Sequence, residues 1–119
     1  MWSSLAETIA WTEATLGVRA GSYPPAGQTG DFAVVNRVGG DTSYPHDNPR
    51  MAIQVWTDSD ENGEQVALAL ARVLPTLKER SGRINGIDRD STITQLGRDE
   101  SGRYVWQVVF TMHCNIRFD

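Results

Sequence analysis

The stretch that decides the fold is RYVWQVVFTMHCNIRF, at residues 103–118. Its residues alternate between apolar and mostly polar side chains. Because successive side chains of a β-strand point to opposite faces, this alternation predicts one strand with an apolar face and a polar face. Each large side chain buried on the apolar face contributes about 1.5–3 kcal/mol, so the rest of the chain is expected to pack on it. The apolar set is Tyr104, Trp106, Val108, Phe110, Met112, Cys114, Ile116 and Phe118.

The length of this predicted strand is unusual. At about 3.3 Å per residue, residues 103–118 would span roughly 50 Å, whereas most strands have about 5–6 residues. We therefore expect the strand either to bend near its middle or to project beyond its own domain and pair with a neighbouring chain.

Length and composition indicate one small domain. The 119 residues fit a single domain, residues 1–119, that is long enough to bury a core. The net charge of −4 argues against general attraction to a nucleic-acid backbone. Cys114 is the only cysteine, and its place on the apolar face predicts a small buried side chain. No run of residues resembles a membrane span or a signal peptide, so we expect a soluble protein that is not exported.

A first helix is predicted near the N-terminus. Ser4 and Glu7 have the spacing of a helix-capping box, which indicates a helix over about residues 5–16 that ends at Gly17. Trp11 falls on the side of this helix opposite its apolar face. That face consists of Leu5, Ile9 and Leu16.

Two antiparallel strands are expected after this helix. Residues 31–38 read as the first and residues 51–56 as the second, where Met51, Ile53 and Val55 alternate with less apolar positions. Trp56 falls on the polar side of that alternation. Residues 21–30, with three Gly and two Pro, and residues 41–49, with two Pro, two Asp, one Asn and a histidine, are expected to be loops.

The C-terminal half is expected to contribute a helix and two strands. The acidic residues 58–61 suit the N-terminus of the second helix, and Pro75 should break it. A turn at residues 85–86, a strand at residues 91–98 and a tight reversal at residues 99–102 then lead into the final strand. The apolar face of the helix consists of Val66, Ala67, Leu70, Val73, Leu74 and Leu77.

The predicted order is helix, strand, strand, helix, strand, strand. This order predicts an α+β domain in which both helices pack on the apolar face of an antiparallel sheet.

One segment resembles a calcium-binding loop. Asp58, Asp60, Asn62 and Gly63 match positions 1, 3, 5 and 6 of an EF-hand loop. The twelfth position should be a bidentate glutamate, and here it is Ala69. We therefore interpret the segment as an acidic helix N-terminus and expect no metal and no cofactor.

The titratable residues form no convincing catalytic set. His46 lies in a Pro-rich segment, and His113 lies on the polar side of the final strand. Asp88 and Asp90 precede a strand and read as solvated acids. No nucleophile, base and orienting group share a recognisable pattern, so we expect no enzymatic activity and assign no catalytic residue.

Three large apolar residues point away from the predicted core: Trp11, Trp56 and Leu68. Together with the overlong strand they favour a protein–protein interface, because tryptophan is enriched among interface residues that dominate binding. We therefore predict that these three residues contact another subunit or a partner.

The sequence resembles the tail terminator proteins of long-tailed bacteriophages, notably those of actinobacterial hosts. The resemblance covers nearly the whole chain. It is carried by DFAVVNRVGG at residues 31–40, by DNPR at residues 47–50 opening a strand that ends at Trp56, and by the Ala/Leu-rich helix and closing hairpin that follow.

This resemblance implies a subunit of a six-membered ring in the neck region of the virion. The ring would cap the head-proximal end of the tail tube, stop its growth and meet the head-completion proteins, with DNA passing through it without specific binding. The resemblance also implies that the strand ending at Gly39-Gly40 and the strand opening at Arg50 are neighbours. The protein would be made in the host cytoplasm.

Two other functions remain open from the sequence. One is a head-closure or head–tail connector subunit of the phage neck. The other is a small enzyme or ligand-binding module that uses His46, Asp88 and Asp90.

Overall fold

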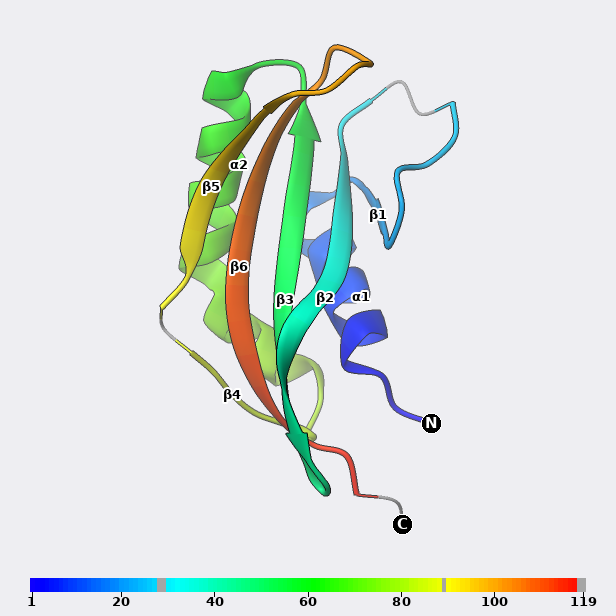
Figure 1. Cartoon of the computed structure of the whole chain (residues 1–119), viewed down its shortest axis with the longest axis vertical. Helices are drawn as coiled ribbons and strands as arrows, with labels where there is room; N and C mark the ends of the chain where they lie inside the picture. Colours follow the sequence, from blue (N-terminus) through cyan, green and yellow to red (C-terminus); the bar gives the residue numbers. More distant parts are fainter. Residues whose placement is uncertain (28–29, 89, 118–119) are drawn as a thin grey trace.

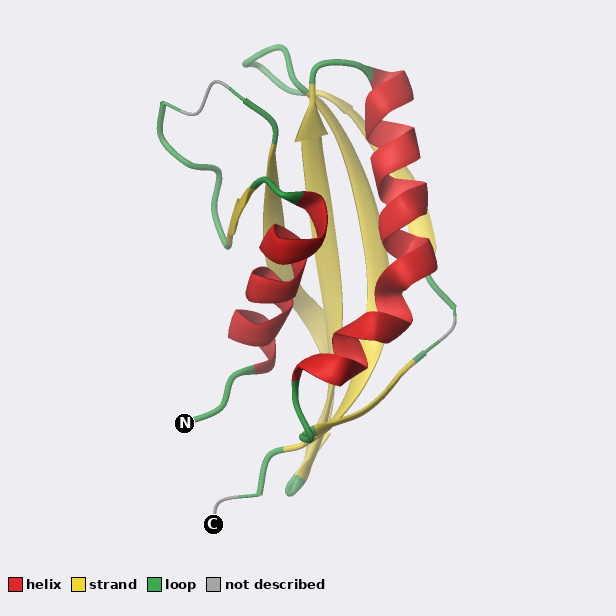
Figure 2. Cartoon of the chain, turned by 180° about the vertical axis from the view of Figure 1, so that it is seen from behind, coloured by secondary structure: helices red, strands yellow, loops and turns green. Residues whose placement is uncertain are grey.

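The computed structural model describes residues 1–27, 30–88 and 90–117 as an α+β fold. Two α-helices lie on one face of a curled six-stranded sheet (Figures 1 and 2). The elements are α1 (Ser4–Leu16), β1 (Arg19–Gly21), β2 (Phe32–Ser43), β3 (His46–Thr57), α2 (Asp60–Val73), the 3₁₀ helix η1 (Leu74–Arg80), β4 (Ile84–Ile87), β5 (Thr92–Arg98) and β6 (Tyr104–Asn115).

The sheet confirms the predicted fold class but is not purely antiparallel. Its strand order is β1-β2-β3-β6-β4, and β5 pairs with the same strand, β6. Strand β1 runs parallel to β2, whereas the other pairs are antiparallel. The prediction missed β1 and assigned residues 85–86 of β4 to a turn, so the predicted element order was wrong. Strands of three or four residues are too short to show an alternating pattern.

Strand β6 organises the sheet, as its alternation predicted. Val108, Phe110, Met112 and Cys114 are almost fully buried beneath the helices, and the strand curves with the sheet (Figure 1). It pairs with β3 on one side and with β4 and β5 on the other. The predicted overhang is wrong for the described residues, because Asn115 at the end of β6 pairs with His46. Phe118 lies outside the described residues.

Helix α1 turns a different face to the core from the one predicted. Ser3 caps it rather than Ser4, while Gly17 ends it in the left-handed conformation, at φ 68°. Thr8 and Thr12 are buried because each hydroxyl donates to the carbonyl one turn earlier, at 2.8 and 2.7 Å. Their methyl groups can therefore face the core without an unpaired polar atom. Leu5, Ile9 and Leu16 pack only partly against the core.

Trp11 lies inside the molecule, so the prediction that it is exposed was wrong. Its side chain is 4% exposed and belongs to the main core. The indole Nε1 donates to Thr76 Oγ1 of η1 at 3.0 Å. The predicted face used Leu5, Ile9 and Leu16 alone, whereas the fully buried Thr8 and Thr12 lie on the same side of the helix as Trp11.

Replacing Trp11 with phenylalanine should lower the free energy of unfolding by about 1–2 kcal/mol, because the indole hydrogen bond and part of the packing are lost. Urea denaturation would measure this change. The matched variant Trp56→Phe also loses an indole hydrogen bond, but its acceptor, Gln54, is half-exposed. The free energy of unfolding should therefore fall less in Trp56→Phe than in Trp11→Phe. Equal costs for the two variants would contradict the assigned environments.

Helix α2 and η1 follow the predicted pattern closely. Ser59 caps α2 by accepting from the backbone N–H of Asn62 at 3.1 Å. The α-helix ends at Val73, and the chain continues through Pro75 as a 3₁₀ helix, which confirms the predicted break. Gly63 lies directly against Trp106, whose indole donates to Asp60 Oδ1 at 3.1 Å. The acidic segment thus begins a helix, as predicted.

The segment predicted as a loop at residues 41–49 is mostly a hairpin. Strand β2 continues to Ser43, the chain turns at Tyr44 and Pro45, and β3 begins at His46. We call residues 37–50 the hairpin arm; its turn forms the lower end of the molecule in Figure 1. A register shift between Arg37 and Gly39 separates the arm from the upper part of β2. Of the two prolines that suggested a loop, Pro45 lies in the turn and Pro49 pairs with Gly40 within the ladder.

Candidate assembly surfaces

The structure places the three predicted interface residues on different surfaces. Trp11 is in the core, Trp56 lies on the sheet face opposite the helices, and Leu68 lies on the outer side of α2. They do not form one patch. Trp56 and Leu68 confirm the prediction that they point away from the main core, whereas Trp11 does not.

Leu68 is the most exposed of the three. Its side chain is 53% exposed on the side of α2 that faces away from Ala67 and Leu70. It lies in a shallow hollow that it shares with Gln65, Ala69 and Arg72. We call these four residues the α2 stripe.

Trp56 is half-buried within its own chain. Its ring stacks on Phe32 with a centroid separation of 5.0 Å, and its Nε1 donates to Gln54 Oε1 at 3.1 Å. The guanidinium carbon of Arg103 lies 5.2 Å from the centre of the Phe32 ring. This small cluster covers apolar surface on the sheet face that the helices leave open, so much of the Trp56 ring already has a partner.

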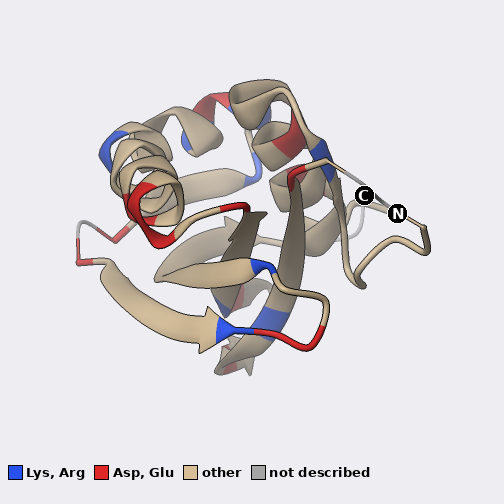
Figure 3. Cartoon of the chain, turned by 90° about the horizontal axis from the view of Figure 1, so that it is seen from above, with Lys and Arg blue, Asp and Glu red and all other residues tan. Residues whose placement is uncertain are grey.

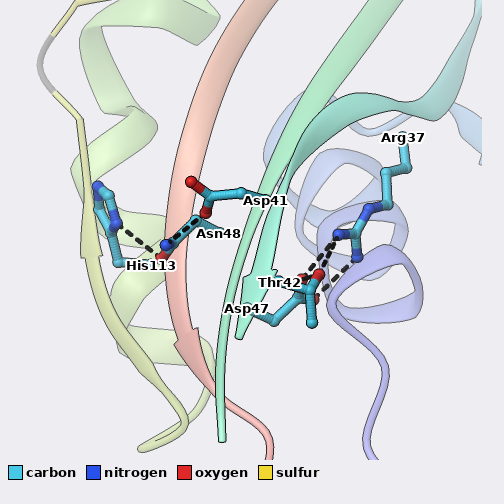
Figure 4. Close-up of polar contacts among 6 residues, drawn as sticks. All are labelled: Arg37, Asp41, Thr42, Asp47, Asn48 and His113. Atoms are coloured by element: carbon cyan, nitrogen blue, oxygen red, sulfur yellow. Dashed lines mark hydrogen bonds and ion pairs between the residues drawn. The ribbon is translucent and has the colours of Figure 1, made fainter. Parts of the chain in front are cut away.

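The side of the arm that faces the helices carries an ion pair. Arg37 on β2 donates both terminal nitrogens to the Asp47 carboxylate on β3, at 2.8 and 2.7 Å (Figure 4). The hydroxyl of Thr42 donates to the same carboxylate at 2.6 Å. The hydrogen bond from Arg37 holds the pKa of Asp47 below its ordinary value and raises the pKa of Arg37. This ion pair therefore joins the two strands of the arm through their side chains.

This ion pair predicts a pH-dependent stability. Because the pKa of Asp47 is lower in the folded chain, its contribution is present above the ordinary carboxyl pKa of about 3.9 and is lost as pH falls through the folded value. Asp47→Asn should lower the free energy of unfolding by about 1–2 kcal/mol at pH 7, a range discounted for the partial exposure of Arg37. Urea denaturation from pH 7 to pH 3 should show wild type and variant converging. A difference that stays constant with pH would contradict this assignment.

The opposite side of the arm carries a row of polar side chains across the sheet. Asn48 donates to Asp41 Oδ1 at 2.8 Å, and His113 Nδ1 lies 2.9 Å from Asn48 Oδ1 (Figure 4). His113 Nε2 lies 2.6 Å from Asp88 Oδ1. This row therefore links β2, β3, β6 and the segment after β4 across the sheet through side-chain contacts.

This row bears on the enzyme alternative. Both ring nitrogens of His113 lie within hydrogen-bond distance of neighbouring side chains, Asn48 and Asp88. Asp88 contacts His113 rather than His46. In the part of the chain that the structure describes, no hydrogen bond or ion pair joins His46, Asp88 and Asp90 to one another. Within residues 1–27, 30–88 and 90–117, no three His, Cys, Asp or Glu side chains form a group able to hold a metal ion.

The hairpin arm also exposes a strand edge. Strand β1 pairs only with Phe32, Ala33 and Val34 of β2. In the described chain, the remainder of β2 pairs with β3 alone, and residues 37–43 are all exposed. Unpaired edges of this kind are regular sites of contact between chains. Sequence analysis missed this edge because residues 41–49, which it predicted as a loop, contain two Pro, two Asp and one Asn, residue types that are depleted in strands.

The lone cysteine is buried, as predicted. Burial raises the pKa of the Cys114 thiol to about 11, which keeps it protonated and unreactive at neutral pH. No helix in the described chain has the length and apolar character to cross a membrane. Comparisons with protein-family models and with curated proteins give no match to this chain.

Proposed function

We propose that this chain is a structural subunit of a bacteriophage tail, a tail terminator that assembles into a ring at the head-proximal end of the tube. The resemblance to that family, which covers nearly the whole chain, suggests this role. The observation that carries it is the hairpin arm, whose β2 edge pairs on one side only. The unpaired backbone N–H and C=O groups of such an edge can form hydrogen bonds with a strand of a neighbouring subunit.

The two exposed surfaces lie on opposite flanks of the subunit. Helix α1 packs over β1 and β2, whereas α2 packs over β3 and β6, toward the other edge of the sheet (Figure 2). The β2 edge and the α2 stripe therefore face different directions. A closed ring requires two unlike surfaces of this kind, because each subunit presents one surface to the preceding neighbour and another to the next.

The charge distribution suits a subunit beside a DNA channel. The first turn of α2 contains Asp60 and Glu61, and Asp99 and Glu100 lie in the β5–β6 turn at the same end of the molecule (Figure 3). With a net charge of −4, the chain repels the phosphate backbone. Such a subunit would let DNA pass without holding it.

A tube-assembly experiment tests the terminator role. The tail tube protein of the same phage is polymerised with and without the purified chain, and tube lengths and gold-labelled chain positions are recorded by electron microscopy. We expect tubes that stop growing and carry label at one end only. Label confined to the portal side of the neck, with no effect on tube length, would instead support the head-closure or connector alternative.

A further inference from the structure

A groove at the lower end of the molecule has no role in the ring described above. It lies between the N-terminal segment, the hairpin arm, the segment before β4 and the segment after β6, and its volume is about 660 Å³. The N-terminal segment and the residues after β6 approach each other there (Figures 1 and 2). We call it the terminal groove.

Cationic groups predominate among the charged side chains of the terminal groove. Arg37, Arg83 and Arg117 line it, together with one acid, Asp47, which is bound to Arg37. Arg83 donates to the backbone oxygens of Asn115 and Arg117, which places its charge on the wall. The guanidinium of Arg117 has no hydrogen bond or ion pair within the described chain.

The groove also receives the start of helix α1. Ser3 and Ser4 line it, and the partial positive charge of a helix N-terminus adds to that of the arginines. Apolar side chains form the rest of the surface, chiefly Trp2, Leu5 and Ile116. An occupant that fits must therefore combine negative charge with apolar side chains.

Trp2 provides a second indication that the groove is incomplete. Its indole Nε1 is shielded from water and has no hydrogen-bond acceptor in the described part of the chain. A buried donor without an acceptor is uncommon in folded proteins. An incoming carboxylate or carbonyl that shifts this indole would give it an acceptor.

We propose that the terminal groove binds an acidic peptide segment of a partner protein, with carboxylates against Arg117 and the start of α1 and an apolar side chain beside Trp2. The charge of the groove is opposite to that of the chain as a whole, whose net charge is −4. The proposal goes beyond the tail terminator role and does not depend on it, because the groove is distinct from both the β2 edge and the α2 stripe.

Two blocked tetrapeptides test this proposal. The acidic probe is Leu-Asp-Glu-Leu, and its uncharged twin is Leu-Asn-Gln-Leu. Each is titrated into the ¹⁵N-labelled full chain while the indole N–H signal of Trp2 is followed, after assignment with Trp2→Phe. The acidic peptide should move this signal and bind about tenfold more tightly than its twin, because the twin lacks charge-assisted hydrogen bonds. Added salt should weaken the binding.

Variants locate the binding site. Arg117→Gln should weaken the acidic peptide about tenfold, whereas Arg98→Gln, on the far end of the sheet, should leave binding unchanged. Arg83→Gln is a second test if Arg117→Gln alters folding, which the remaining amide signals would reveal. Equal binding of the two peptides, an unmoved Trp2 signal or no effect of either groove variant would overturn the proposal. Tighter binding of a single-stranded thymidine oligonucleotide at the same residues would overturn it in favour of a nucleic-acid contact.

Discussion

Replacing Gly40 with alanine is expected to lower the free energy of unfolding by about 3–5 kcal/mol and to open the hairpin arm. Gly40 has φ +99°, and a Cβ built on it would lie 2.0 Å from the carbonyl oxygen of Asn48 and 2.8 Å from the backbone nitrogen of Arg50. These are backbone atoms of the paired strand, so the two strands would have to separate. Urea denaturation would give the energy, and amide hydrogen exchange in β2 and β3 would locate the opening.

The adjacent glycine provides the control. Gly39 also has a positive φ, at +149°, but a Cβ there would meet nothing within 4 Å. Gly39→Ala should therefore lower the free energy of unfolding only by the backbone strain, about 1 kcal/mol. Similar losses for the two variants would show that the close approach of β3 to Gly40 is not what requires glycine.

The second large effect is expected on assembly rather than on folding. Leu68→Glu places a charge in the centre of the α2 stripe, and if this stripe joins neighbours, each interface should lose about 2 kcal/mol or more, roughly thirtyfold in affinity. Because every junction of a ring repeats the change, ring formation should fail at concentrations where the wild type assembles. Light scattering and circular dichroism would separate this loss from a loss of folding.

Leu96→Glu is the matched control for Leu68→Glu. Leu96 on β5 is 46% exposed, close to the 53% of Leu68, and it lies at a register irregularity of an outer strand rather than on α2. The same charge is added at a similarly exposed leucine, so general effects of charge on solubility are matched. Disassembly by both variants, or by neither, would argue against the α2 stripe as the contact.

Sequence patterns predicted the parts of the fold where one physical signal is repeated many times. The alternation along β6 identified the buried face from Val108 to Cys114, and the apolar spacing of α2 identified Ala67 and Leu70. Single-residue signals also succeeded where the chemistry is unambiguous. Pro75 ends the α-helix because it has no backbone N–H, and Gly17 takes the left-handed conformation.

Elements without such signals were missed. Strands β1 and β4 are too short to carry a period, and the hairpin arm contains the Gly and Pro residues that usually mark loops. The core-facing side of helix α1 was missed because the prediction considered only Leu5, Ile9 and Leu16, and not Thr8 and Thr12, whose hydroxyls bond to their own helix. A pattern of Thr or Ser at four-residue spacing beside Trp11 is the signal that would have corrected it.

The interface prediction likewise succeeded where a local sequence pattern exists and failed where contacts depend on the tertiary structure. Leu68 was recognised because a leucine opposite the apolar face of an amphipathic helix must be exposed. Trp56 was placed on the correct sheet face, but its stacking on Phe32 depends on strand register, which no local pattern reveals. The terminal groove escaped prediction because it joins residues from the two ends of the chain with the base of the arm.

The mass of the purified full-length chain in solution, measured by light scattering over a concentration series, tests the central claim most directly. If this protein is a ring-forming tail subunit, the series should contain a closed species of about six copies, and electron microscopy should show rings of that species on tail tubes. A mass of one chain at every concentration, together with tails whose ends lack the protein, would contradict the account.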